Sequence, residues 1–202
     1  VPRNLILRYS QPGDWILDQF VGSGTTLIEA KLLNRNAVGV DINPQSVSIS
    51  EKNIQFESNS VSKIFVREGN AVKLDFLKNE KIDFICTHPP YADIIQYSKN
   101  IEGDLSRLGT KEFLETMEKV AKESLRVLKR GKNCAVMMGD IRNRGKVMPL
   151  GFRTMELFLN AGFQLKEIII KEQHNCKSML YWKDRNNKFL LLAHEYIFVF
   201  QK

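Results

Sequence analysis

The sequence predicts an α/β fold of the doubly wound, Rossmann-like type, built on a mostly parallel seven-stranded sheet. Short apolar runs alternate with amphipathic helical stretches, and this alternation is typical of a parallel sheet with helices on both faces. A turn containing Gly22 and Gly24 follows the first apolar run. A chain of 202 residues can bury the core of one such domain. We therefore expect a single domain over residues 1–202, with no separate target-recognition domain.

The first half of the chain is predicted to contain parallel strands and the helices that connect them. A short amphipathic helix is expected first, because Leu5, Ile6 and Tyr9 recur at helical spacing. The expected strands are runs rich in β-branched and aromatic residues, at 15–18, 37–41, 63–67 and 83–87. The expected helices follow the glycine turn and an Asn-Pro pair, at 25–33 and 45–56.

The second half is predicted to start with the clearest helix, at 111–128. Its apolar residues fall at spacings of three and four, namely Phe113, Met117, Val120, Ala121, Leu125 and Leu128. Gly131 is expected to end this helix. A strand at 134–138 and a helix at 148–160 should follow. The last two strands, at 164–170 and 195–200, are expected to pair antiparallel at one edge of the sheet.

Composition favours a nucleic-acid partner over a membrane location. The 30 basic residues exceed the 23 acidic ones and give a net charge of +7, which suits a polyanion because basic side chains that neutralise phosphates release counterions. No apolar run approaches the roughly 20 residues that span a bilayer. The cysteines Cys86, Cys134 and Cys176 are scattered, so we expect reduced thiols in a cytoplasmic protein, with no disulfide and no metal site.

The glycine turn is suited to a nucleotide-like cofactor. Glycine takes backbone angles that are closed to other residues and leaves room for a ligand against the main chain. The helix after the turn directs its free amides to the same place. Asp41 ends the second predicted strand, 19 positions after Gly22, where a carboxylate can accept hydrogen bonds from ribose hydroxyls. The third glycine of the dinucleotide-binding motif is missing, so this turn is not the dinucleotide fingerprint.

A second motif, Thr87-His88-Pro89-Pro90-Tyr91, follows the fourth predicted strand. The prolines fix the backbone and remove competing amide donors. The tyrosine ring offers a flat surface on which a nucleobase can stack. We therefore expect this turn to grip a flat substrate beside the cofactor.

Together the two motifs resemble those of the amino-methyltransferases of DNA, the adenine-N6 and cytosine-N4 DNA methylases. The resemblance implies methyl transfer from S-adenosylmethionine to the exocyclic amino group of a DNA base. It also implies a set of cofactor-binding residues, namely Asp18, Phe20, Gly22, Ser23, Gly24, Thr25, Asp41 and Asn70. Asn70 stands where the family usually has an aspartate that binds the adenine amino group, so it keeps a carbonyl acceptor but lacks the charge. The final stretch, 194–200, is also similar to a common ending of the family.

The resemblance further implies a catalytic set made of His88, Pro89, Pro90 and Tyr91. In the family, the side chain at the first position and the carbonyl of the first proline accept hydrogen bonds from the target amine and localise its lone pair. The family has Asp, Ser or Asn where this chain has His88. A neutral imidazole can accept one hydrogen bond, whereas an imidazolium cannot. Two interpretations stay open: His88 is a direct acceptor, or it is a bystander and Pro89 is the principal acceptor.

The expected substrate is DNA whose target base is flipped out of the duplex. Thr87 favours cytosine-N4, because the family commonly has Thr before the Ser of its cytosine enzymes; adenine-N6 stays open. Cations and aromatic side chains at 173–188, and the basic segment 142–146, suit nucleic-acid contacts. Specificity is expected in loops such as 91–109, in a separate specificity subunit of a restriction–modification system, or in a part outside this sequence.

Two alternative functions remain. RNA methyltransferases that act on guanine N2 resemble this layout, with a glycine-rich turn followed by Pro-Pro-Tyr. A catalytically inactive, nucleic-acid-binding subunit of the same fold is the other alternative, and the departures at Asn70 and His88 favour it.

Overall fold

The sheet of this protein contains seven strands in the order β3-β2-β1-β4-β5-β9-β8. The computed structural model describes residues 1–91, 101–143, 145–173 and 190–202. The strands are β1 (Trp15–Asp18), β2 (Asn36–Asp41), β3 (Ile64–Glu68), β4 (Ile82–Thr87), β5 (Leu128–Met138), β8 (Gln164–Glu172) and β9 (His194–Gln201). Neighbours from β3 to β5 are parallel, and β9 is antiparallel to both β5 and β8. The predicted fold, including its antiparallel edge pair, is confirmed.

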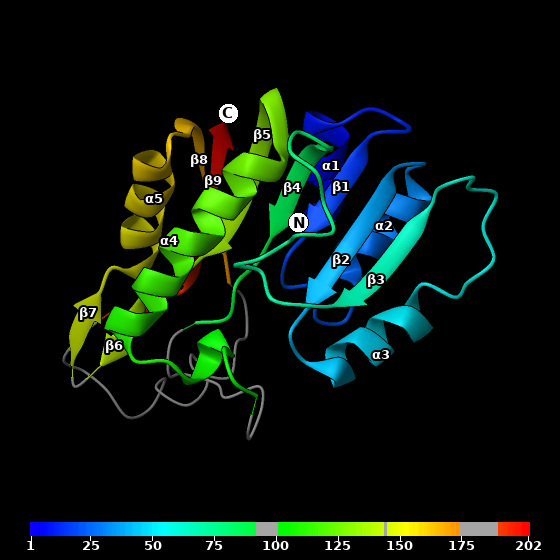
Figure 1. Cartoon of the computed structure of the whole chain (residues 1–202). Coiled ribbons are helices and arrows are strands. Elements are labelled where there is room, and N and C mark those ends of the chain that lie inside the picture. The colour runs from blue at the N-terminus through cyan, green and yellow to red at the C-terminus, as the bar shows by residue number, and fades with distance from the viewer. Residues whose placement is uncertain (92–100, 144, 174–189) are drawn as a thin grey trace.

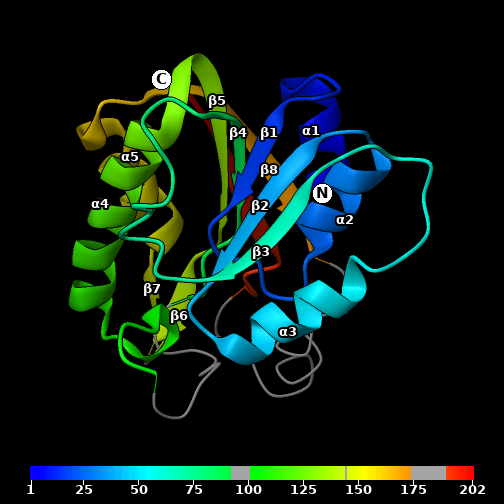
Figure 2. The same cartoon turned by 45° about the vertical axis from the view of Figure 1, so that its right-hand side comes forward.

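Helices cover both faces of this sheet, as Figure 1 and Figure 2 show. They are α1 (Pro2–Tyr9), α2 (Thr25–Leu32), α3 (Pro44–Asn53), α4 (Thr110–Val127) and α5 (Leu150–Ala161), with a short 3-10 helix, η1 (Leu105–Arg107), before α4. Phe113 of α4 and Phe158 of α5 share one buried cluster with Phe200 of β9. Leu27 of α2 and Phe84 of β4 belong to the cluster on the opposite face. The sheet is therefore the middle of three layers.

The end of α4 differs from the prediction. The helix stops at Val127, and Leu128 begins β5 by pairing with Ile82 of β4. Gly131, expected to end the helix, lies inside β5 with a φ of 72°. Leu128 is buried as predicted, but the sheet buries it, and an apolar pattern alone does not separate these two environments.

Two further boundaries were wrong. The helix expected at 148–160 begins at Leu150, because Met148 pairs with Ile141 in a hairpin of β6 (Ile141–Asn143) and β7 (Lys146–Met148) that the sequence did not predict. The helix expected to reach 56 ends at Asn53. Lys31 donates hydrogen bonds of 2.8 Å to the carbonyls of Ile54 and Phe56 and holds these residues outside the helix.

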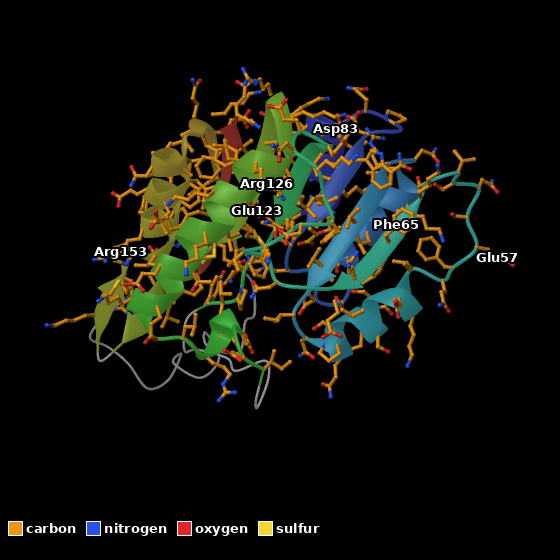
Figure 3. All side chains as sticks on the ribbon, in the orientation of Figure 1. Glu57, Phe65, Asp83, Glu123, Arg126 and Arg153 are labelled. Atoms are coloured by element: carbon orange, nitrogen blue, oxygen red, sulfur yellow. The ribbon has the colours of Figure 1, made fainter. Side chains whose placement is uncertain are left out.

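The segment between β3 and β4 is held against α4 by hydrogen bonds to two residues of that helix, which form an ion pair with each other. Figure 3 shows Glu123 and Arg126 close together on that helix, and their side chains form a contact of 2.6 Å. Glu123 accepts a hydrogen bond from the amide of Leu74 at 2.6 Å, and Arg126 donates to the carbonyls of Leu74 and Leu77 at 3.0 and 2.8 Å. This clamp holds a segment without regular secondary structure against the core.

The strand directions place the predicted motifs at one edge of the sheet. The parallel strands β1 to β5 all end there, and β9 begins there because it runs antiparallel to β5. The arrowheads of β2, β3 and β4 point to this lower edge in Figure 1. Ligands of open α/β sheets bind at such an edge, where neighbouring connections diverge to opposite faces. The candidate active site is built on it.

Candidate active site

The glycine turn connects β1 to α2 and is closed by backbone hydrogen bonds. The amide of Val21 donates to the carbonyl of Val40 at 2.9 Å, which ties the turn to β2. Gly22 and Gly24 have φ values of 52° and 85°, in the left-handed region that favours glycine. Gly24 is the N-cap of α2, and among the described residues no side chain caps this end of the helix. The first amides of α2 are therefore available to a ligand.

Asp41 ends β2 and supports this turn. One carboxylate oxygen accepts from the amide of Gly22 at 3.0 Å, and the other accepts from the amide of Asn43 at 2.9 Å. Burial raises the pKa of Asp41, and hydrogen bonds from the backbone amides of Asn43, Gly22 and Ile42 act in the opposite direction. Each oxygen keeps further lone pairs, so the carboxylate can still accept from a diol.

Asp18 is almost completely buried, at 5% exposure. Its carboxylate accepts hydrogen bonds from the amide of Phe20 at 3.1 Å and from the hydroxyl of Thr87 at 3.0 Å. Burial raises its pKa to about 6. Asp18 thus connects the cofactor turn to the end of β4, while Ser23 and Thr25 stay exposed on the turn itself.

Asn70 lies after β3 in a short turn of its own. Its side-chain carbonyl accepts from the amide of Val72 at 3.1 Å, and one lone pair stays available. Gly103, with a φ of 85°, approaches so closely that a Cβ there would lie 3.2 Å from both the Asn70 amide nitrogen and Ile42 Cδ1. The segment around Gly103 therefore covers the ends of β2 and β3, a contact that the sequence did not predict.

The second motif follows β4 and is held by its tyrosine. The Tyr91 hydroxyl donates to Oε1 of Glu195 at 2.5 Å, and His88 Nε2 lies 3.2 Å from the same hydroxyl. Pro89 is buried, whereas the His88 side chain is 42% exposed. The turn therefore presents an imidazole at the same sheet edge as the glycine turn.

Glu195, at the start of β9, is the main site residue that the motifs did not reveal. Its side chain is 6% exposed and forms an ion pair with Lys171 of β8. Burial raises the pKa of Glu195, but hydrogen bonds from Lys171, Tyr91 and Gln173 outweigh it and hold the pKa below its usual value. Its only sequence signal is an acid at the start of the final predicted strand, in a stretch that is similar to a common ending of the family.

The close approach of Gly139 also restricts the position of Tyr91. A Cβ at Gly139, just after β5, would lie 3.1 Å from the Tyr91 hydroxyl oxygen and 3.4 Å from Cγ of Glu195. Glycine at this position therefore lets Tyr91 and Glu195 approach each other. Four strand ends, those of β4, β5, β8 and β9, contribute to the position of one aromatic ring.

The segments expected to contact nucleic acid are only partly described. Residues 92–100 and 174–189, which include much of two candidate loops, lie outside the described residues. In the segment 142–146, Arg142 donates to the carbonyls of Gly145 and Leu190, both at 3.1 Å. At least one basic side chain of this segment is therefore engaged within the protein.

A cavity of about 720 Å³ lies away from the motifs. Its lining includes Trp15 and Ile82, which begin β1 and β4, together with Phe65 and Phe76. It is thus at the amino ends of the central strands, on the side where Figure 3 labels Phe65. We do not assign it to the candidate active site.

In the described ranges no helix is long and apolar enough to cross a bilayer. The same ranges contain no cluster of His, Cys, Asp or Glu side chains arranged to bind a metal ion.

Comparison with known proteins identifies the family. A sequence profile described as DNA methylase matches residues 1–52 and 82–202, which include both motifs. The chain belongs to this DNA methylase family. The family and the fold assign S-adenosylmethionine as its cofactor, as the sequence predicted.

Curated relatives of this family member include type II methyltransferases and an enzyme named for a tRNA substrate. A tRNA (guanine(10)-N2)-dimethyltransferase of Methanothermobacter thermautotrophicus is 35% identical over 104 residues, covering 52% of this chain and 29% of that protein. The type II methyltransferase M.BglI of Bacillus subtilis is 40% identical over 55 residues, covering 27% and 16%. The type II methyltransferase M.MjaII of Methanocaldococcus jannaschii is 30% identical over 113 residues, covering 56% and 16%. The chain thus matches less than a third of each of these proteins.

Solved structures agree on the fold. A SAM-dependent methyltransferase of Methanosarcina mazei superposes with a TM-score of 0.68 at 16% identity, covering 98% of this chain and 96% of that chain. TrmN of Thermus thermophilus superposes with a TM-score of 0.62 at 18% identity, covering all of this chain and 48% of that chain. At such identities these structures bear on the fold alone.

The described residues fit S-adenosylmethionine. A Cβ at Gly22 would meet only the Phe20 carbonyl, at 4.0 Å, so there is open space beside the turn. Asp41 stands at this turn as a carboxylate acceptor, and the first amides of α2 have no side-chain cap. These groups suit the ribose hydroxyls and the carboxylate of the methionine part, respectively.

Proposed function

We propose that this chain is the catalytic domain of a DNA methyltransferase that acts on the exocyclic amino group of cytosine (N4) or adenine (N6). The observation that carries the proposal is the DNA methylase profile, which spans the glycine turn and the His88–Tyr91 turn. The sheet edge that brings these two turns together supports it. S-adenosylmethionine supplies the methyl group when bound at Gly22, Gly24 and Asp41.

The second turn binds and orients the target base. The Pro89 carbonyl and the His88 side chain accept hydrogen bonds from the amine, whose lone pair is otherwise delocalised into the aromatic ring. The Tyr91 ring stacks on the base, which contributes about 1–3 kcal/mol. The base reaches this pocket by leaving the duplex.

The expected target base rests on the family's residues at positions 87 and 88. The preference for cytosine relied on Thr87, but that side chain is 4% exposed and donates to Asp18. Its influence on a bound base is therefore indirect. We keep cytosine-N4 as the expected target, with adenine-N6 as the other outcome of the test.

Sequence specificity and the nucleic-acid backbone contacts are proposed for loops 91–109 and 173–188 or for a partner specificity subunit of a restriction–modification system.

A second candidate is methylation of guanine N2 in RNA. The tRNA dimethyltransferase relative is 35% identical over 52% of the chain, against 30% over 56% for the M.MjaII relative. Its match favours this candidate, whereas the family profile favours DNA. An inactive, nucleic-acid-binding subunit stays an outcome of the same test.

Incubation with tritium-labelled S-adenosylmethionine and either genomic DNA or unmodified tRNA, followed by nucleoside analysis, tests the proposal. We expect label in DNA as N4-methylcytosine, and its loss in Tyr91→Ala. N6-methyladenine alone would overturn the preference for cytosine, and labelled N2-methylguanosine would establish the RNA candidate. A chain that binds the cofactor but labels neither substrate would be the inactive subunit.

A further inference from the structure

We propose that Glu195 and Tyr91 fix His88 as the tautomer that carries its proton on Nε2 and presents an unprotonated Nδ1 to the target amine. Glu195 and Tyr91 are then positioning residues for the acceptor at position 88. The role of Nδ1 toward the amine rests on the proposed function, whereas the tautomer itself is a property of the protein alone.

The Glu195 carboxylate sets the direction of the first hydrogen bond. Its side chain is buried, and its ion pair with Lys171 keeps it charged. A charged carboxylate can only accept hydrogen bonds. The Tyr91 hydroxyl, 2.5 Å from Oε1, must therefore be the donor in that contact.

The Tyr91 hydroxyl in turn decides which imidazole nitrogen of His88 carries a hydrogen. A tyrosine hydroxyl has one proton, and in Tyr91 that proton points to Glu195. Toward His88 Nε2, 3.2 Å away, the hydroxyl oxygen can only accept. Nε2 must therefore carry a hydrogen.

A neutral imidazole has one N–H, so a hydrogen on Nε2 leaves a lone pair on Nδ1. Burial lowers the pKa of His88; the charge of Glu195, 3.6 Å from Nε2, opposes this effect, and the charge of Lys171 adds to it. The net direction keeps the ring neutral near pH 7. Within the described part of the chain, Nδ1 makes no hydrogen bond, and the side chain is 42% exposed.

This arrangement would supply the acceptor that the family obtains from Asp, Ser or Asn. A histidine without a fixed tautomer would present a donor instead of an acceptor to the amine for part of the time. Orientation of a histidine by a carboxylate through its other ring nitrogen is a general device in catalytic sites. Here the carboxylate of Glu195 orients His88 through the hydroxyl group of Tyr91.

Nitrogen NMR of protein labelled at its three histidines tests the tautomer without substrate or cofactor. His88→Gln assigns the signals of His88. Near pH 8 we expect Nε2 to give the shift of a protonated nitrogen and Nδ1 that of an unprotonated one. Tyr91→Phe should convert His88 to a mixture of tautomers. The matched control is Tyr196→Phe, because the Tyr196 hydroxyl lies 2.9 Å from His194 Nε2 and its loss should leave the His88 signals unchanged.

A proton on Nδ1 of His88 in the unaltered protein would overturn the inference, as would identical His88 signals in Tyr91→Phe. Glu195→Gln, which keeps the shape but loses the charge, should lower the methyl-transfer rate about tenfold or more, with unchanged cofactor affinity. A fixed Nε2–H tautomer in a chain that methylates no nucleic acid would refute the proposed function alone. Methylation by a chain whose His88 has its proton on Nδ1 would refute this inference alone.

Discussion

The carboxylates that end β1 and β2 both have raised pKa values, but their partners differ. Asp18 is buried and accepts from Phe20 and Thr87, which makes it a connection between strands. Asp41 accepts only backbone amides and borders the glycine turn. The same type of side chain thus links two strands at one strand end and is proposed to bind the cofactor at the next.

Asp18 predicts a pH dependence of stability. Its pKa in the folded protein is about 6, against a reference of 3.8, so folding favours the protonated acid. The stabilisation is present below the reference value and is lost as pH rises through the folded value. Relative to Asp18→Asn, the unaltered protein should lose about 1–2 kcal/mol of unfolding free energy between roughly pH 5 and pH 8. Urea unfolding measures this, and parallel pH profiles of the two proteins would contradict it.

Asp41 predicts an effect on the cofactor. Asp41→Ala should weaken S-adenosylmethionine binding by about 1–3 kcal/mol, because hydrogen bonds to a charged acceptor are lost. Asp41→Asn is the control, since it keeps one acceptor for the ribose and should bind with intermediate affinity. Calorimetry measures all three proteins. An unchanged affinity in Asp41→Ala would remove this residue from the site.

At the scale of elements, the local motifs could be predicted and the contacts across strands could not. The glycine turn and the Pro-Pro-Tyr turn are short stretches whose chemistry is fixed by adjacent residues. Glu195 meets Tyr91 only because β9 inserts between β5 and β8. Leu128 was predicted to lie in a helix, because burial beside Ile82 in the sheet gives the same apolar pattern as burial on a helix face. These contacts between strands depend on strand order and register, which cannot be predicted from a single sequence.

The turn before α2 provides a prediction at this scale. Gly24→Ala places a side chain in a left-handed conformation, which costs about 1 kcal/mol, and adds a Cβ 3.2–3.3 Å from Ser50. Gly13→Ala is a matched control, because Gly13 has a φ of 87° and no atom within 4 Å of its added Cβ. Urea unfolding should show a larger loss of stability for Gly24→Ala, and only this variant should lose cofactor affinity. Equal losses in both variants would show that the approach of Ser50 is unimportant.

At the scale of the molecule, the two halves of the sheet carry the two parts of the proposed site. The proposed cofactor side comes from β1, β2 and β3, and the proposed base side comes from β4, β5, β8 and β9. On the proposed cofactor side, the sequence alone indicates the glycine turn and Asp41, because these residues follow one another along the chain. On the proposed base side, the sequence indicates only the turn, since Glu195 and Gly139 reach Tyr91, and Lys171 reaches Glu195, through folding.

The central claim is that this edge combines a cofactor site with a separate platform for the base. The most direct measurement is the single-turnover rate of methyl transfer to DNA at saturating S-adenosylmethionine for Tyr91→Ala, with Tyr91→Phe as the control that keeps the ring. Loss of stacking predicts a rate at least about tenfold lower in Tyr91→Ala, a smaller loss in Tyr91→Phe, and unchanged cofactor affinity in both. A Tyr91→Ala protein that transfers methyl groups at the unaltered rate would contradict the claim.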